Sequence, residues 1–179
     1  TSPFQGTGMT TSPDASTDVA PPKQRALHPL DFGVVGIGAS AGGLQAIKLF
    51  FENMPQDNGM AFVIILHLSP DHESIADKII QESTKMPVLQ VTESVPIERN
   101  HVYVISPAHR LAMDDGRLEV SPADPRLGRT SAIDLFFRDL ADVHRERAFC
   151  LVLSGTGSDG AVGLSRIKEQ GGVTLAQAP

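Results

Sequence analysis

The chain has 179 residues, of which 41% are hydrophobic and 20% charged, and this size and composition predict one compact domain with a polar appendage. Its net charge of −6 argues against a nucleic-acid partner, because such proteins neutralise phosphates with Lys and Arg. No apolar run approaches the roughly 20 residues of a membrane span, and no signal-peptide core is evident, so we expect a cytoplasmic protein without direct membrane insertion. The single cysteine, Cys150, lies in an apolar run and is expected to be buried.

Residues 1–30 differ in composition from the rest of the chain. They are rich in Thr, Ser, Pro and Asp and show neither helical nor strand periodicity, which predicts a disordered N-terminal tail. Met9 is followed by Thr-Thr-Ser, which is typical of a native start, so residues 1–8 are interpreted as a remnant of a recombinant vector. The predicted catalytic domain occupies residues 31–179.

From Phe32 onward, short apolar runs alternate with amphipathic segments. The runs lack period-2 alternation, as expected of parallel strands covered on both faces, and lie at residues 33–37, 61–66, 149–153 and 173–176. Helices are predicted at residues 44–54, 74–83, 133–146 and 162–170. The pattern predicts an α/β fold with a mostly parallel, doubly wound (Rossmann-like) sheet and helices on both faces.

The middle of the chain predicts a different arrangement. Short strands are expected at residues 88–91, 101–105, 111–113 and 117–120, with Asp114-Asp115-Gly116 as a hairpin turn. We therefore expect a small antiparallel β extension there.

The segment from Gly36 to Gly43 fits two motifs that imply different chemistries. Gly38-x-Ser40-x-Gly42 is the pattern of a nucleophile elbow, in which a serine on a tight strand-to-helix turn is held clear of the backbone. Gly36-x-Gly38-x-x-Ala41 is also a dinucleotide fingerprint, in which glycines allow a pyrophosphate to approach a helix N-terminus. The first motif makes Ser40 a catalyst, whereas the second makes it a neighbour of a phosphate.

Polar side chains at the predicted strand ends favour the catalytic interpretation. One strand leads to Ser40, the next leads to His67, and the run that ends near Leu153 leads to Asp159. These are the parts of a nucleophile, a general base and an orienting carboxylate. A dinucleotide site would instead need an acidic residue where His67 stands, so nucleotide binding is the weaker alternative.

Each of these residues also has a structural interpretation. Ser40 could cap the following helix, His67 could be an ordinary histidine at a strand end, and Asp159 could stabilise the next helix through its dipole. His72 is the nearest rival base. Asp134 is the rival carboxylate, although Ser131-x-x-Asp134 is typical of a capping-box variant.

At the level of motifs, the chain resembles the catalytic domain of chemotaxis protein-glutamate methylesterases (CheB). The resemblance rests on Gly36 to Gly43, on His67 at its strand end, and on the stretch Leu153 to Gly160; His67-Leu68-Ser69-Pro70 is closest to members fused to a CheR-type methyltransferase domain. It implies Ser40 as nucleophile, His67 as base and Asp159 as third member of a triad.

The same resemblance implies further residues and the substrate. The backbone N–H groups of Ala41 and Thr156 would form the oxyanion hole, and Arg129 and Ser131 would line the substrate cleft. The expected substrates are glutamate γ-methyl esters on the cytoplasmic helices of chemoreceptors, with glutamine deamidation as a related activity. Neither a cofactor nor a metal is implied.

Two features depart from the family pattern. No receiver domain precedes the catalytic region, which is compatible with a methyltransferase domain in the same polypeptide. The family's domain also continues beyond Pro179, so the resemblance implies a C-terminally shortened domain. The alternative to an enzyme is a catalytically silent docking module that kept the fold and its loops.

Overall fold

The computed structural model describes residues 30–67, 74–114, 116–124, 126, 132–153 and 158–178. Its centre is a six-stranded sheet in the order β3-β5-β2-β1-β8-β9, in which every neighbouring pair is parallel. The strands are β1 (Val34–Ser40), β2 (Ala61–His67), β3 (Val88–Val91), β5 (Val102–Ile105), β8 (Ala148–Val152) and β9 (Val173–Ala176). The predicted parallel α/β fold is therefore confirmed.

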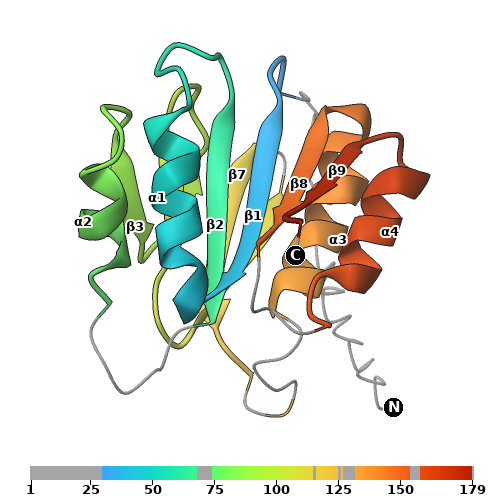
Figure 1. Ribbon diagram of the computed structural model, residues 1–179. Helices are drawn as coiled ribbons and strands as arrows, with labels where there is room; N and C mark the ends of the chain where they lie inside the picture. The colour runs from blue at the N-terminus through green and yellow to red at the C-terminus, as the bar shows by residue number, and fades with distance from the viewer. Residues whose placement is uncertain are drawn as a thin grey trace, which may run out of the picture.

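Helices lie on both faces of this sheet, as a doubly wound fold requires. The helices are α1 (Leu44–Glu52), α2 (Ala76–Gln81), α3 (Ala132–His144) and α4 (Ala161–Glu169), with short 3-10 turns η1 (Ala41–Gly43) and η3 (Arg145–Arg147). Helices α1 and α2 pack together in front of the sheet in Figure 1, whereas α3 lies behind it and packs against α4. Within the described ranges, no helix combines the length and apolar character needed to cross a membrane.

A second, antiparallel sheet lies behind the first. It consists of β4 (Val95–Pro96), β7 (Arg117–Pro122) and β6 (His109–Asp114) in that order. The β6–β7 hairpin closes through Gly116, which has a φ of +76°, as expected of a glycine in a tight turn; Asp115 lies outside the described residues. The predicted hairpin is confirmed.

The assignment of residues 88–91 and 101–105 to the antiparallel extension was wrong. They form β3 and β5, which are parallel members of the main sheet. All four residues of β5 are buried, because the strand lies between β2 and β3 and is covered on both faces.

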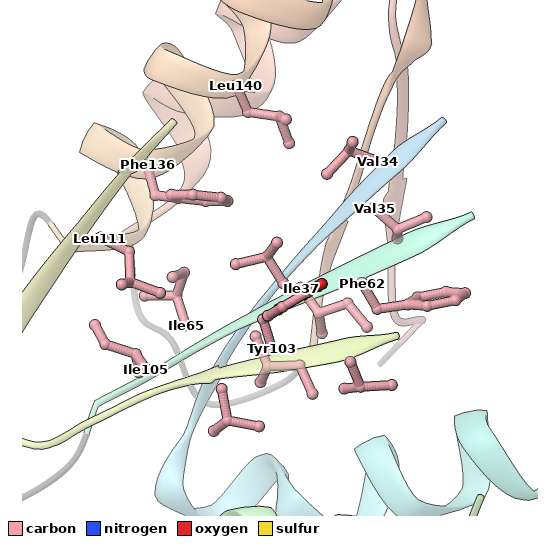
Figure 2. Packing of buried hydrophobic residues seen from close by; sticks show 14 of the residues in the cluster. Val34, Val35, Ile37, Phe62, Ile65, Tyr103, Ile105, Leu111, Phe136 and Leu140 are labelled. Carbon is pink, nitrogen blue, oxygen red and sulfur yellow. The ribbon is translucent and has the colours of Figure 1, made fainter. Parts of the chain in front are cut away.

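The core forms on both faces of the central strands. Figure 2 shows Phe136 and Leu140 pointing from α3 toward the sheet, with Leu111 of β6 beside them. On the opposite face, Phe51 of α1 meets Phe62 of β2 edge-on, with ring centroids 5.3 Å apart. Cys150 in β8 is 1% exposed, as predicted, and its burial raises the pKa of the thiol.

Strands β1 and β2 are buried along their whole length except at their last residues. Those last residues are Ser40 and His67. The buried strands therefore fix the backbone positions of two polar residues at the carboxyl edge of the sheet.

Candidate active site

Ser40 and His67 are opposite one another on adjacent strands. The parallel register of β1 and β2 pairs Val34 with Ala61 and ends by pairing Ser40 with His67. Neighbouring strands lie about 4.8 Å apart. The predicted meeting of a serine and a histidine at the sheet edge is thus built into the strand register.

Both side chains project from the face that α3 covers. A Cβ added to Gly36 would lie 3.0 Å from Phe137, and one added to Gly38 would lie 2.5 Å from Ile133, so these positions face α3. Side chains alternate along a strand, and Ser40 therefore shares this face. His67 also faces α3, because it is the register partner of Ser40 in a parallel pair of strands.

Asp159 completes the group from a third segment. Its Oδ2 lies 2.6 Å from Nε2 of His67, and its side chain is 2% exposed whereas that of His67 is 24% exposed. The same carboxylate accepts hydrogen bonds from the backbone N–H groups of Ile133 (3.2 Å) and Asp134 (2.9 Å). Two backbone donors thus hold one buried carboxylate against the imidazole.

This arrangement distinguishes the two nitrogens of His67. A carboxylate that accepts from Nε2–H leaves Nδ1 as the basic nitrogen. In the serine-protease template the carboxylate instead bonds Nδ1–H, so the imidazole presents its other nitrogen to the carboxylate here.

The geometry of Ser40 does not support its interpretation as a helix cap. Ser40 precedes η1, but its side chain makes no capping hydrogen bond. Its φ of −75° and ψ of 169° are ordinary extended values, so the turn is tight without backbone strain. A Cβ at Gly42 would come within 3.6 Å of Ser40 Oγ, so the glycine keeps the space beside the hydroxyl open.

The glycines of the dinucleotide fingerprint serve a different purpose. Such a motif follows the end of its strand, whereas Gly36 and Gly38 lie inside β1. Their missing side chains let Phe137 and Ile133 of α3 pack directly on the strand. The glycines of the fingerprint therefore allow close packing of α3 on the sheet, which favours the interpretation of Ser40 as a catalytic residue.

The rival residues are engaged elsewhere. Asp134 Oδ1 accepts a hydrogen bond from the backbone N–H of Gly163 at 2.6 Å. His101 Nδ1 lies 2.7 Å from the Arg99 carbonyl oxygen, and His109 lies in the small sheet. His72 lies outside the described residues.

The remaining predicted site residues fall mostly in segments that the structure does not describe. Ala41 is the first residue of η1, directly after Ser40, where a helical N–H has no partner within its own turn. Thr156, Arg129 and Ser131 lie outside the described residues. Within the described part of the chain, no cluster of three or more His, Cys, Asp or Glu side chains could hold a metal.

The sequence did not predict how Asp159 is held. The dipole interpretation placed Asp159 at the start of the following helix, α4, but its backbone partners lie at the start of the preceding helix, α3. Nothing in the local pattern links residues 133 and 159, because tertiary packing alone brings these helix starts together.

Comparison with known proteins gives the class of this fold. The solved catalytic domain of CheB methylesterase from Thermotoga maritima has the same fold, with a TM-score of 0.72 and 18% sequence identity. The match covers 81% of this chain and 79% of that domain. The chain therefore shares the parallel α/β fold of that domain.

Sequence comparison then gives the family. The family model described as CheB methylesterase matches residues 35–179, so the chain belongs to the CheB methylesterase family of enzymes. A putative protein-glutamate methylesterase/protein-glutamine glutaminase of Leptospira interrogans is 27% identical over 151 residues, which cover 84% of this chain and 78% of the relative.

Other relatives are much longer than the matching region. An uncharacterised 104.1 kDa protein of Rhodobacter capsulatus is 37% identical over 101 residues, which are 56% of this chain but 10% of the relative. The chain spans 40 to 43% of the length of several further methylesterase relatives.

Proposed function

We propose that this chain is a serine hydrolase that removes methyl groups from glutamate γ-methyl esters of chemoreceptors. One observation carries the mechanism: Asp159 is fixed 2.6 Å from Nε2 of His67, while Ser40 is the register partner of that histidine. A histidine oriented by a buried carboxylate beside a serine is the arrangement needed to activate a hydroxyl.

In the first step, Ser40 Oγ attacks the ester carbonyl carbon and passes its proton to Nδ1 of His67. The resulting oxyanion is stabilised by backbone N–H groups, for which Ala41 and Thr156 are our candidates. Collapse of the tetrahedral intermediate expels methanol, which takes the proton from the imidazolium. The substrate's glutamyl group is now esterified to Ser40.

In the second step, the acyl-enzyme is hydrolysed by the reverse of these steps, with water in place of methanol. His67 takes a proton from water, the hydroxide attacks the acyl carbon, and Ser40 leaves with the proton. Asp159 holds the imidazole orientation throughout and stabilises its charged form. A glutamine side chain would pass through the same acyl-enzyme with ammonia as the leaving group, which is the basis for proposing deamidation.

The substrate and setting are also proposals. The accessible ends of β1 and β2 suit a substrate presented on another protein, as a cytoplasmic receptor helix would be, and Arg129 and Ser131 are our candidates for contacting it. Activity in chemotaxis, in the cytoplasm, follows from that substrate. We assign catalysis to residues 31–179 and treat residues 1–30 as a tail.

A methyltransferase domain in the same polypeptide is a further proposal. The match covers 10% of the Rhodobacter capsulatus relative, so a region similar to this chain can be one part of a much longer polypeptide.

The direct test is methanol release from a methylated receptor. Ser40→Ala and His67→Ala should each remove nearly all activity, and because the triad acts as a unit, the double variant should be little worse than either single one. His101→Ala is the matched control, because its imidazole interacts locally with Arg99 and Glu98. Near-wild-type turnover by folded His67→Ala would refute the assignment.

A further inference from the structure

The first turns of α3 and α4 exchange hydrogen bonds between carboxylates and backbone amides. Asp159, just before α4, accepts from the N–H groups of Ile133 and Asp134 in α3. In return, Asp134 of α3 accepts from the N–H of Gly163 in α4 at 2.6 Å. Each carboxylate satisfies amides that the first turn of a helix leaves without intrahelical partners.

The two helices are in very close contact at this point. A Cβ added to Gly163 would lie 2.5 Å from Phe137 Cβ and 3.1 Å from the Asp134 carbonyl oxygen. The Asp134 carboxylate therefore binds the backbone of α4 at a point where α4 already packs tightly against α3. The start of α4 is fixed relative to α3 by this hydrogen bond and by packing.

The position of α4 determines where Asp159 lies. Only Gly160, in a left-handed conformation with a φ of +99°, separates Asp159 from the first residue of α4. A shift of the helix start would carry the carboxylate away from Nε2 of His67, where a displacement of about 1 Å is costly for catalysis. The hydrogen bond from Gly163 to Asp134 opposes that shift.

We infer that Asp134 is a positioning residue for ester hydrolysis, which acts through Asp159 and not on the substrate. The inference rests on the proposed triad and extends it. We define the α3–α4 brace as two sets of hydrogen bonds: Gly163 N–H to the Asp134 carboxylate, and the N–H groups of Ile133 and Asp134 to the Asp159 carboxylate. This brace sets the orientation of His67.

Two variants and one control separate this role from a structural one. Asp134→Ala removes the acceptor, and Asp134→Asn keeps an oxygen in its place. Asp142→Ala is the control, because its ion pair with Arg166 (2.8 Å) also joins α3 to α4 but lies on the exposed surface, away from Asp159.

We expect Asp134→Ala to lower kcat by up to about 100-fold, the cost of a displacement of about 1 Å at a catalytic group, with KM changed much less. Asp134→Asn should restore most of kcat, and Asp142→Ala should leave it unchanged. In an Asp159→Ala background, Asp134→Ala should lower Tm but cause no further loss of kcat, because the group through which it acts is gone.

A second readout is independent of turnover. The proton shared by His67 Nε2 and Asp159 should give a downfield NMR signal that shifts or broadens in Asp134→Ala and persists in Asp142→Ala. Should Asp134→Ala fail to fold, Asp134→Glu displaces the carboxylate and replaces it in both measurements.

Three results would contradict the inference, and each would exclude a different part of it. Unchanged kcat and an unchanged proton signal in Asp134→Ala, with a clear loss in Asp159→Ala, would overturn the brace and leave the triad intact. A kcat loss that persists in the Asp159→Ala background would mean that Asp134 acts by another route. Full activity of Asp159→Ala would overturn both the triad and this inference.

Discussion

At the scale of single residues, Asp159 has both a histidine and a helix N-terminus as partners, although the helix is α3 and not α4, for which the sequence suggested a dipole interaction. It contacts the histidine of the site and also binds the N-terminal amides of a helix. The two roles support each other, because a carboxylate held by two amides has little freedom to leave the imidazole. A change at this position should therefore affect both catalysis and stability.

Asp159→Asn should lower turnover steeply, by up to ~10⁴-fold on the serine-protease template, because an amide can select the wrong imidazole tautomer. The free energy of unfolding should fall by about 1–2 kcal/mol, since the amide has one acceptor oxygen for the donors that the carboxylate satisfies. Melting temperature and methanol release measured on one preparation check both effects. Normal turnover with a lower melting temperature would remove Asp159 from the triad.

The local sequence was sufficient to nominate the three central residues. Ser40, His67 and Asp159 each follow an apolar run, and such ends meet at one edge of a parallel sheet. It was insufficient for the roles of Ile133 and Asp134, since these depend on which helix start lies beside Asp159. The pairing of Asp134 with Gly163 is equally non-local.

At the scale of elements, the glycines of β1 determine how closely α3 approaches the site. Gly38 lies two residues before Ser40, and the side chain of Ile133 occupies the space above it. The backbone N–H of that same isoleucine binds Asp159. Helix–sheet packing and the position of the carboxylate are therefore linked at one point.

Gly38→Ala should destabilise the fold by about 1–3 kcal/mol, because the new methyl would lie 2.5 Å from Ile133 and the core is already filled. Chemical denaturation measures this loss. Adding Ile133→Ala should recover part of what Gly38→Ala costs, as a double-mutant cycle would reveal. Purely additive effects would contradict the proposed contact.

The predictions of strands and helices were correct where a helix follows each strand along the chain. They failed at β3 and β5, which are parallel although no long helix separates them in sequence. The uninterrupted apolar run Val102–Ile105 was the available signal, because a strand with one solvated face would alternate. The nearby hairpin consists of β6 and β7 alone and does not extend to β3 or β5.

At the scale of the whole molecule, the candidate site lies where the order of the strands in the sheet reverses. Strand β1 is followed by β2 on one side and borders β8 on the other, and a doubly wound sheet binds its ligands at the carboxyl edge of such a switch point. Residues 40, 67 and 159 are distant in sequence, and only this topology brings them together. The fold class was predictable from the apolar pattern, whereas the distances within the site required the three-dimensional structure.

The central claim is that this topology converts Ser40 into an activated nucleophile, and a labelled fluorophosphonate probe tests it most directly. The probe modifies activated serine hydroxyls, so the wild-type protein should be labelled and mass spectrometry should locate the adduct on Ser40. Labelling should disappear in Ser40→Ala and fall sharply in His67→Ala. Undiminished labelling of His67→Ala, or an adduct on another serine, would contradict the account.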